Sequence, residues 1–401
     1  MRLGIDAWGL SGDLFATGMG QYTYRLLTTL PEVDRELTAI AYAAPGEPRP
    51  AWLADHVDWR PVGRPLPAKL TALHSRVIAL PVAVAADRLD LFHSPAVHMR
   101  PFFPPLPRLG CPHVVTLHDL IPLTYYRLRD LPVRQQVFYR WNLRRAASAG
   151  GLITVSEQSR MEILLRLRVP PHRVRTIHNG VDFAPNAMES ALARRQVERP
   201  YILYAGSYEP RKNLVRALHA YRRLVEAGFP HRLVAVVERA SGHEPEVARA
   251  LAAMDIGPRV RFVHSLPEED LRALYTHAEA LFFPSLAEGF GYPPMQAAAI
   301  GLPAVVSDIP ALREVMGPDA LYVDPLDEGA MAAGLAAVLG DPALRSRLRD
   351  QGRERARRFT PEACTRAHLE LYRDVLAGRL ALPAPEVAGR RTRPAGQGVD
   401  G

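Results

Sequence analysis

Residues 201–225 read YILYAGSYEPRKNLVRALHAYRRLV. The apolar run Tyr201–Ala205 predicts a buried strand, and apolar residues at helical spacing over residues 214–225 predict an amphipathic helix. Five residues, Glu209–Asn213, form a tight loop before that helix. The stretch therefore predicts one strand–loop–helix unit, from which α/β folds with parallel sheets are built.

The loop Glu209–Asn213 contains an unusual lysine. The chain has 50 lysines and arginines, of which only Lys69 and Lys212 are lysines. A lysine kept beside Arg211 suggests a site that uses a compact ammonium group. With Asn213 as the expected N-cap, the two cations flank a helix start, which is a favourable place for a phosphate. The alternative is two solvated cations at the start of a surface helix.

The same alternation of strands and helices runs through the chain. In the first half, strands are predicted at Arg2–Ala7, Leu37–Ala43, Asp90–His93, His113–His118, Gly151–Val155 and Val174–His178, and helices at Gly20–Leu30, Lys69–Ala86, Pro132–Ala149 and Glu157–Leu167. In the second half, strands are predicted at Tyr201–Ala205, Leu233–Val237, Val260–Val263, Ala280–Phe283, Ala304–Ser307 and Ala320–Val323. This pattern predicts an α/β fold of parallel sheets covered on both faces.

The pattern divides the chain into two doubly wound, Rossmann-like domains. We place the first at residues 1–183, a linker at 184–199, the second at 200–358, a final amphipathic helix at 359–379 and a disordered tail at 380–401. The tail is rich in Pro, Gly and Arg and has no apolar period. Thr360 is the expected N-cap of the final helix. In two such domains the carboxyl ends of the sheets face a shared cleft, where ligands bind.

Composition narrows the class of protein. The chain has 401 residues, a net charge of +8 and two cysteines, which excludes a disulfide framework. We expect a cytoplasmic protein, because the start lacks the apolar core of a signal peptide and the apolar stretch 77–86 is too short to span a bilayer. The positive charge suits phosphates, nucleic acid or an anionic membrane. No basic stretch is interleaved with aromatic residues, so we expect no nucleic-acid partner.

A second cluster follows a predicted strand that ends at Pro284. Glu288 follows four residues later, and a turn with two glycines comes after it. Pro293 and Pro294 then suit the first turn of a helix. Gly289 and Gly291 allow backbone N–H groups to approach a ligand closely. Gln296 falls about one helical turn further on. The alternative is an ordinary strand-to-helix turn with an exposed acid.

The first domain contributes two further candidates. Gly18 and Gly20 follow the first strand, where helix N–H groups can bind an anion, although a simple turn explains them equally well. His118 ends a predicted strand and should point into the cleft, unless it is a hydrogen-bonded histidine of the core or rim. Its neighbour Asp119 is interpreted as a structural residue that caps the following turn.

Six short motifs follow one another along the chain. They are Thr17–Gly20, Asp90–Ser94, Thr116–Asp119, His178–Asp182, Glu209–Asn213 and the Glu288 cluster. Together they resemble the retaining GT-B glycosyltransferases of family 4, also called group 1, over nearly the whole chain. The run Glu288–Pro294 is most similar to bacterial mannosyltransferases of polysaccharide assembly.

The resemblance implies a sugar transfer from a nucleotide-diphosphate sugar, with GDP-mannose favoured. It assigns catalytic roles to His118, Arg211, Lys212 and Glu288, with the two cations on the diphosphate. It assigns donor binding to Gly18, Gly20, Arg211, Lys212, Val263, Ser265, Glu288, Gly289, Phe290, Gly291 and Gln296. No Asp-x-Asp motif stands at a strand end, so no metal and no cofactor are expected.

One position departs from the family pattern, in which a second Glu follows the first after seven residues. Here that position is Gln296, whose carbonyl oxygen can accept a ribose hydroxyl but carries no charge. We therefore expect weaker donor binding. A nucleotide-sugar-binding protein of low or no turnover and a GT-B sugar-nucleotide epimerase remain alternatives. A phosphorylase is disfavoured because neither Lys69 nor Lys212 has the setting of a pyridoxal-binding lysine.

The resemblance also implies an acceptor, which is a glycan or a lipid-linked sugar bound by the first domain, and a final helix that crosses back to that domain. His93 and His98 do not make a metal site by their spacing. The Pro101–Pro107 run is interpreted as a rigid surface loop rather than a lipid contact. Pro132–Ala149 is either an interfacial helix or, as we favour, a covering helix with a solvated basic face. Peripheral contact with an anionic membrane, on the inner face of the plasma membrane, is kept as an open alternative.

Overall fold

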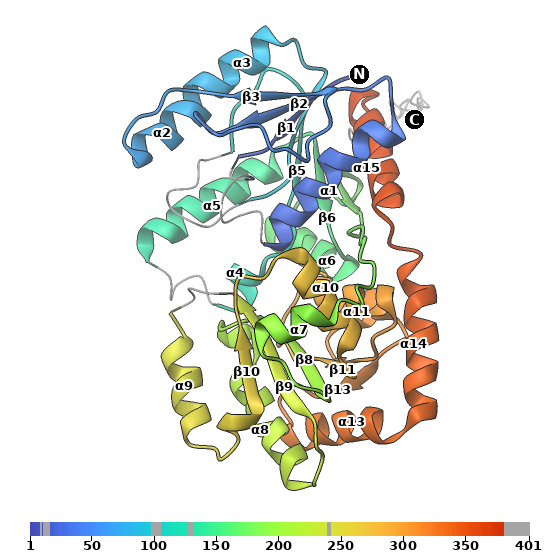
Figure 1. The fold of residues 1–401 in the computed structure, drawn as a ribbon. Helices are drawn as coiled ribbons and strands as arrows, with labels where there is room; N and C mark the ends of the chain where they lie inside the picture. The colour runs from blue at the N-terminus through green and yellow to red at the C-terminus, as the bar shows by residue number, and fades with distance from the viewer. Residues whose placement is uncertain (9, 11–16, 98–105, 127–131, 239–241, 381–401) are drawn as a thin grey trace, which may run out of the picture.

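Two parallel sheets organise the chain in the computed structural model, which describes residues 1–8, 10, 17–97, 106–126, 132–238 and 242–380. The seven-stranded sheet has the order β3-β2-β1-β4-β5-β6-β7, and the six-stranded sheet the order β10-β9-β8-β11-β12-β13. Helices cover both faces of each sheet, and the two domains lie one above the other (Figure 1). The predicted α/β fold with two Rossmann-like domains is confirmed.

Most strands lie where the sequence predicts them. Those of the first domain are β1 (Arg2–Asp6), β2 (Thr38–Ala43), β3 (Val57–Pro61), β4 (Leu91–Ser94), β5 (His113–Thr116), β6 (Gly151–Thr154) and β7 (Val174–Thr176). Those of the second are β8 (Tyr201–Ser207), β9 (Arg232–Glu238), β10 (Val260–Val263), β11 (Ala280–Phe283), β12 (Ala304–Ser307) and β13 (Leu321–Val323). Only β3 was not predicted. It is an edge strand with one fully buried residue, Val57, so it carries no apolar run.

The helices follow the predicted alternation with more breaks. In the first domain they are α1 (Gly18–Val33), α2 (Ala68–His74), the π turn η1 (Ser75–Ala79), α3 (Leu80–Ala86), α4 (Ile121–Thr124), α5 (Val133–Ala147) and α6 (Glu157–Leu167). After these come α7 (Glu189–Arg195), α8 (Leu214–Glu226), α9 (Glu244–Ala252), α10 (Glu268–His277), α11 (Tyr292–Ile300), α12 (Pro310–Met316), α13 (Glu328–Gly340), α14 (Pro342–Ala356) and α15 (Pro361–Leu376). Short 3-10 turns are η3 (Pro171–Arg173), η4 (Pro210–Lys212) and η5 (Gly257–Arg259). Helix α7 lies within the predicted linker, and its Ala191 and Leu192 pack into the core of the second domain.

The unit that begins with β8 has the predicted form, with one correction. Asn213 does not cap α8 with its side chain, because its backbone is left-handed, at φ 61°. Its amide instead donates to the carbonyl oxygens of Pro284 and Pro325, at 3.0 and 2.7 Å. Asn213 therefore ties the loop after β8 to the loops after β11 and β13.

Helix α15 crosses back to the first domain, as the resemblance implied (Figure 1). The Thr360 hydroxyl accepts from the N–H of Ala363 at 3.2 Å, so the predicted N-cap is confirmed. Leu369, Leu371 and Tyr372 join the core of the first domain against α1. Leu380 also packs into that core, so the prediction that the disordered tail starts at residue 380 is wrong for this residue. Its apolar side chain is buried after the turn that ends α15, and residues 381–401 lie outside the described residues.

A chain of five buried hydrogen bonds joins α15 to α1 and the first sheet. Tyr372 Oη lies 2.8 Å from His93 Nδ1, and His93 Nε2 lies 2.8 Å from Thr116 Oγ1. Thr116 Oγ1 in turn lies 2.8 Å from the hydroxyl of Tyr22, which also bonds to His368 Nε2. The last bond joins His368 Nδ1 to the carbonyl oxygen of Cys364, at 2.7 Å. Burial lowers the pKa of His93 well below its usual value and that of His368 to about 4. Both rings are therefore neutral.

The last bond fixes the direction of the whole chain. A carbonyl oxygen only accepts, so Nδ1 of His368 carries its proton and Nε2 must accept from Tyr22. Working backward, Thr116 donates to Tyr22, and the ring of His93 donates to Thr116 and accepts from Tyr372. Each of the four side chains between the two ends, His93, Thr116, Tyr22 and His368, thus donates one hydrogen bond and accepts one. A satisfied buried network of this kind holds α15 in one position on the first domain.

The His178–Asp182 motif serves the contact between the domains. Glu314 of α12 accepts from the N–H groups of Glu157 and Gln158 at the start of α6, at 2.7 and 3.1 Å, and lies 2.8 Å from His178 Nε2. Gly180 passes so close to the crossing segment that a Cβ there would lie 2.5 Å from Pro361 Cα. The motif therefore packs the two domains and the crossing segment together.

The buried histidines predict acid sensitivity. The folded-state pKa of His368 is about 4, below the usual 6.5, so the unfolded chain binds protons that the folded chain does not. The contribution of these histidines to the free energy of unfolding should be fully present above about pH 6.5. It should fall by roughly 1–2 kcal/mol per histidine as the pH drops to about 5. Denaturant unfolding at about pH 7.5 and about pH 5 measures this. In His368→Gln the amide can make both hydrogen bonds without titrating. An unchanged pH dependence in this variant would contradict the assignment.

Candidate active site

Adjacent strands bring the predicted catalytic residues together. Strands β8 and β11 are paired, and the loops at their carboxyl ends carry Arg211, Lys212 and Glu288. Lys212 Nζ lies 2.6 Å from one oxygen of Glu288, and a guanidinium nitrogen of Arg211 lies 3.1 Å from the other. The Glu288 side chain is only 9% exposed. One carboxylate therefore joins two cations in a nearly dry setting.

Backbone contacts fix these loops. Arg211 donates from its guanidinium to the carbonyl of Ala287 at 2.8 Å, and its own carbonyl accepts from the N–H of Leu286 at 2.8 Å. The hydroxyl of Tyr204 donates to the carbonyl of Lys212 at 2.9 Å. The geometry of the cluster is therefore set by rigid elements before any ligand binds.

The charges of the cluster depend on one another. Burial by itself would raise the pKa of Glu288, but Lys212 and Arg211, with a further hydrogen bond from Ser285, outweigh it and hold the pKa below its usual value. Burial, and then repulsion by Arg211, lower the pKa of Lys212, while Glu288 partly offsets them. Burial also disfavours the charge of Arg211, yet Glu288, Glu209 and Asp119 raise its pKa above the usual value. Glu288 thus stays ionised as the counter-ion of both cations.

This pairing refines the sequence prediction of a cationic pocket. The structure places Arg211 and Lys212 beside Glu288 as predicted, but both cations already have an anionic partner. An anion that enters the site has to share them with Glu288. The site is therefore a cluster of two cations paired with Glu288, with Glu209 as a second partner of Arg211, rather than two free cations.

The first domain meets this cluster at Gly289. A Cβ on Gly289 would lie 2.9 Å from Asp119 Oδ2 and 3.3 Å from the carbonyl oxygen of His118. The carboxyl ends of β5 and β11 therefore touch across the contact between the domains. Only a glycine lets the two backbones approach this closely.

The ring of His118 is fixed in place by a hydrogen bond and by packing against an aromatic ring. Its Nε2 lies 2.9 Å from the carbonyl oxygen of Pro95, and its ring packs edge-on against Tyr22 at 4.9 Å. Burial lowers the pKa of His118 to about 4, although the hydrogen bond to Pro95 opposes this. The ring is neutral near pH 7 and its one proton lies on Nε2, toward the carbonyl oxygen of Pro95, so Nδ1 can accept a hydrogen bond but the ring supplies no charge.

Asp119 is a site residue that sequence reasoning treated only as structural. Its Oδ1 does accept from the N–H of Ile121 at 3.0 Å, as predicted. Its other oxygen faces Gly289, and burial raises the pKa of Asp119 against the opposing effect of Arg211. Across the same contact, the hydroxyl of Tyr126 donates to Glu209 at 3.0 Å. Nothing in a single sequence signals these pairs, because each joins residues of different domains.

The glycines of α1 need one correction. The N–H of Gly20 is not available to a ligand, because it donates to the capping hydroxyl of Thr17 at 3.2 Å. Ligand contact at this helix start would fall to the N–H groups of Gly18 and Met19, which precede the first helical hydrogen bonds. Gly18 faces the second domain, since a Cβ there would lie 3.6 Å from the ring of Tyr292.

The remaining predicted residues divide into backbone and side-chain candidates. Val263 ends β10 and Phe290 precedes α11, but both side chains are buried in the core, so only their backbones can contact a ligand. Ser265 has a left-handed backbone, at φ 50°. Gly291 also has a positive φ, of 95°. Gln296 is half-buried on α11.

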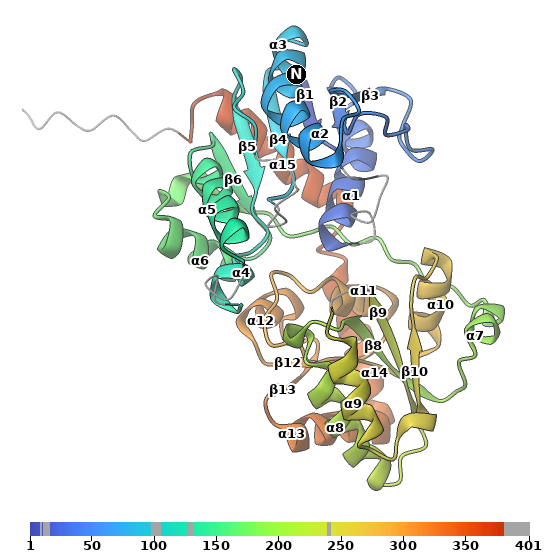
Figure 2. The same cartoon turned by 90° about the vertical axis from the view of Figure 1, so that its left-hand side faces the viewer.

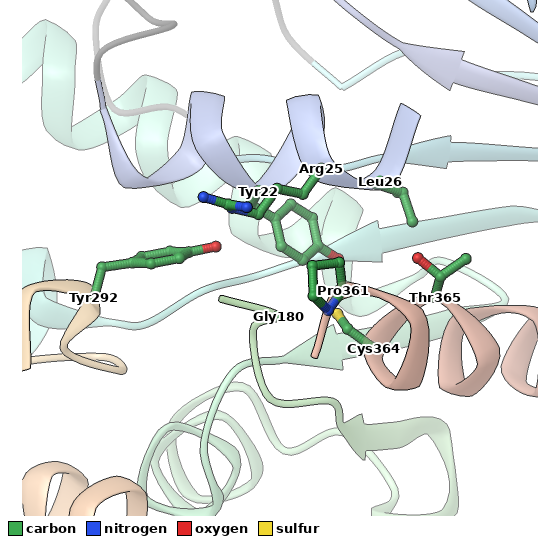
Figure 3. A pocket seen from close by; sticks show the side chains of 8 residues that line it. All are labelled: Tyr22, Arg25, Leu26, Gly180, Tyr292, Pro361, Cys364 and Thr365. Carbon is green, nitrogen blue, oxygen red and sulfur yellow. The ribbon is translucent and has the colours of Figure 1, made fainter. Parts of the chain in front are cut away.

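A small pocket lies where α1, the start of α11 and the start of α15 meet (Figure 3). The guanidinium of Arg25 and the hydroxyl of Tyr292 point toward one another there (Figure 3). Arg25 donates to the carbonyl of Asp182 at 3.0 Å, but its Nε and the Tyr292 hydroxyl are buried without a hydrogen-bond partner among the described residues. Buried polar atoms of this kind are normally satisfied by water or a ligand.

The described residues hold neither a metal cluster nor a membrane-spanning helix. No group of three or more His, Cys, Asp or Glu side chains there is arranged to hold a metal ion. None of the helices described between residues 1 and 380 is both long and apolar enough to span a bilayer. The expectation that His93 and His98 do not form a metal site concerns a residue, His98, that lies outside the described residues.

The contact at Gly289 generates a prediction. Gly289→Ala puts a methyl group against Asp119 and the backbone of His118, so the domains must shift apart. We expect the Tm to fall by roughly 3–8 °C. Gly257→Ala is the control, because no atom lies within 4 Å of a Cβ at that position. Equal melting of the two variants would show that the contact does not constrain the protein.

Family models match both halves of the chain. The one described as "Glycosyltransferase Family 4" matches residues 16–185, and the one described as "Glycosyl transferases group 1" matches residues 190–355. The boundary between the two matches falls within the predicted linker.

Curated proteins and solved structures agree with these matches. The chain is 33% identical over 236 residues to the O-antigen chain mannosyltransferase B of Escherichia coli. The matched region covers 56% of this chain and 61% of that protein. It is 33% identical over 265 residues to the MMP alpha-(1->4)-mannosyltransferase of Mycolicibacterium hassiacum, covering 62% of each. The matched part thus spans about three fifths of these relatives' own length.

Among solved structures, the sucrose-phosphate synthase of Thermosynechococcus elongatus superposes with a TM-score of 0.74 at 22% identity, over 94% of this chain and 100% of that one. This likeness concerns the fold, which is the GT-B arrangement of two Rossmann-like domains. With both domains matched by family models and the motifs in place at their contact, the chain belongs to the group 1, family 4 glycosyltransferases.

Proposed function

We propose that this protein transfers a sugar from a nucleotide-diphosphate sugar to a glycan or lipid-linked acceptor, with retention of the anomeric configuration. The observation that supports this most is the Glu288 cluster. It sets two cations and one carboxylate at the carboxyl ends of β8 and β11, where parallel sheets bind their ligands. GDP-mannose is the favoured donor, because the similar proteins of Escherichia coli and Mycolicibacterium hassiacum described above are both named mannosyltransferases.

The chemistry follows from where charge develops. Departure of the sugar leaves growing negative charge on the diphosphate and positive charge on the sugar. Arg211 and Lys212 would oppose the negative charge, and they are already positioned by backbone contacts, so little reorganisation is needed. The N–H groups of Gly18 and Met19 would add contacts from the first domain.

Glu288 would change partners during this cycle. In the ligand-free site it balances both cations, and an incoming diphosphate would take over part of that role. The carboxylate would then be free to accept hydroxyls of the donor sugar and to offset its positive charge. His118, as a neutral ring whose Nε2 proton is directed at Pro95, would accept a hydrogen bond from a hydroxyl of the same sugar at Nδ1. A phosphate oxygen of the leaving group would take the proton of the acceptor hydroxyl on the same face.

No metal or cofactor enters this proposal. The two cations supply positive charge at the leaving group, and no Asp-x-Asp motif stands at a strand end. The acceptor would bind to the first domain. Contact with an anionic membrane, and a cytoplasmic location on the inner face of the plasma membrane, belong to the same proposal. Nucleic acid is not among the proposed partners.

A second candidate is a nucleotide-sugar-binding protein of low or no turnover. Gln296 favours it, because a neutral amide holds ribose hydroxyls less strongly than a carboxylate. A sugar-nucleotide epimerase of the same fold is the other alternative. An epimerase would convert the nucleotide sugar without releasing the nucleotide, so product analysis separates the three.

The central test measures nucleotide release. The full chain is incubated with GDP-mannose or UDP-sugars and a lipid-linked acceptor, with and without a chelator. We expect release with one donor, unaffected by the chelator, and a loss of roughly 100-fold or more in Lys212→Ala, because one charge on the leaving group is missing. Turnover that survives both Lys212→Ala and Glu288→Ala would refute the site. Binding of a donor without release or conversion would favour the binding protein.

The balance of charge gives a separate prediction. Glu288→Gln keeps the shape of the side chain but removes the anion that the two buried cations share and leaves Arg211 only the more exposed Glu209, so we expect a less stable ligand-free protein. A diphosphate would replace the missing anion. GDP should therefore raise the Tm of Glu288→Gln more than that of the wild type, while turnover is lost.

Glu209→Gln is the matched control for that experiment. Glu209 also lies near Arg211, at 3.3 Å, but its side chain is 42% exposed and touches only one of the cations. We expect its nucleotide-induced shift in Tm to resemble that of the wild type. If GDP stabilises Glu288→Gln no more than the wild type, the carboxylate does not compete with the diphosphate.

A further inference from the structure

A cavity of about 320 Å³ opens between α8 and α9 in the second domain. The two helices lie side by side and pack into the same core cluster (Figure 2). The volume falls at the lower end of the roughly 300–1,000 Å³ of small-molecule sites. The α8–α9 cavity is therefore large enough for a small organic ligand. Its polar lining consists of Tyr208, Glu209, Arg216, His219, Glu246 and Glu328 beside Asn213.

The inner wall of the α8–α9 cavity is apolar. Leu214 and Val247 line it, and they are only 2% and 3% exposed because they belong to the core of the domain. The ring of Tyr208 stacks on Phe262, with the ring centroids 6.0 Å apart. An apolar floor of this kind, with a few polar groups around it, is typical of sites that bind small molecules.

Charged side chains of both signs surround this floor. Glu246 of α9 and Glu328 at the start of α13 each lie 3.9 Å from a basic side chain, which is beyond hydrogen-bond distance. Their oxygens therefore keep the capacity to accept hydrogen bonds. Arg216 donates from one guanidinium nitrogen to Asn213 at 3.3 Å, and its other N–H groups remain as donors. His219 lines the cavity one turn further along α8.

This lining favours one class of ligand. A phosphate would meet three glutamates against one arginine, and a cationic ligand would compete with the basic side chain that already lies within 4 Å of each glutamate. An apolar ligand would desolvate the charged groups without pairing them. In the described ranges, no group of three or more His, Cys, Asp or Glu is arranged to hold a metal ion. A neutral sugar fits best, because its hydroxyls both donate and accept while its C–H groups cover the apolar wall.

The α8–α9 cavity borders the catalytic cluster. Glu209 lines the cavity and also lies 3.3 Å from Arg211. The hydroxyl of Tyr126, from the first domain, donates to the same carboxylate at 3.0 Å, and its ring packs edge-on against Tyr125. Burial raises the pKa of Tyr125, and the charges of Arg211 and Arg216 oppose this rise, so Tyr125 lies near both cations. Two aromatic rings of the first domain thus stand between the cluster and the cavity.

We propose that the α8–α9 cavity binds sugar units of a glycan acceptor beyond the unit that reacts. The reacting hydroxyl would lie in the first domain beside the Glu288 cluster, and the following rings would pass Tyr125 and Tyr126 and reach the second domain over Glu209. The acceptor is then an oligosaccharide that both domains hold, rather than a single sugar. The role as an acceptor site rests on the proposed function, whereas binding of an oligosaccharide to the cavity needs neither donor nor turnover.

The first test measures the binding of oligosaccharides to the full chain without a donor. The probes are trisaccharides of mannose, glucose, galactose and N-acetylglucosamine, each compared with its monosaccharide by saturation-transfer NMR and titration calorimetry. We expect at least one trisaccharide to bind roughly tenfold more tightly than its monosaccharide, because further rings add hydrogen bonds to charged groups. GDP should not displace it. The proposal fails if none of the trisaccharides binds, or if GDP displaces the one that does, since the cavity would then belong to the donor.

A matched pair of double variants locates the binding. Arg216→Ala/Glu246→Ala removes one cation and one anion from the cavity, and should weaken trisaccharide binding by roughly tenfold or more. Arg222→Ala/Glu226→Ala removes an ion pair of 3.4 Å from α8 outside the cavity, and should bind like the wild type. None of the four residues is buried, so circular dichroism should show both variants folded. Equal binding by the two double variants would overturn the proposal.

Turnover separates the α8–α9 cavity from the proposed function. In the nucleotide-release assay, Arg216→Ala/Glu246→Ala should raise the KM for a trisaccharide acceptor roughly tenfold and leave kcat and the KM for a monosaccharide acceptor unchanged. Release with the same KM change for both acceptors, or a lower kcat with both, would sustain the transferase and overturn the cavity as an acceptor site. Trisaccharide binding that this variant abolishes, without release from any donor, would sustain the cavity and count against the transferase.

Discussion

The bridge from Glu288 to Arg211 and Lys212 is the interaction on which the candidate site depends. It joins two loops that leave neighbouring strands, and it keeps two cations together where they would otherwise repel each other. Two like charges within one dry cluster are tolerable only with a shared anion. The same feature makes the site responsive, because a diphosphate can compete for both cations and release the carboxylate.

The two domains hold this cluster by different means. Gly289 lets the backbones of the two domains touch, and Glu314 connects α12 to the start of α6. The hydrogen-bond chain that begins and ends on α15 fixes the crossing helix to the first domain. Tyr22 belongs to that chain and also packs against His118. The position of a candidate site residue thus depends on contacts that extend to the end of the described chain.

The first domain differs from the second in what it exposes. Its outer helices carry apolar stripes and arginines, whereas Arg76 is buried with Asp6. Burying an ion pair while exposing valines and leucines is unfavourable for a helix that meets only water.

The sequence by itself determined the alternation of strands and helices, the two domains and the loops that carry Arg211, Lys212 and Glu288. These depend on local periodicity and on glycine and proline, which act within a few residues. It could not show that Glu288 is shared by both cations, that Asp119 faces Gly289, or that Asn213 bridges loops instead of capping α8. Nor could it tell which side of residues 68–86 faces water. Each of these depends on residues distant in the chain, so only the tertiary structure decided them.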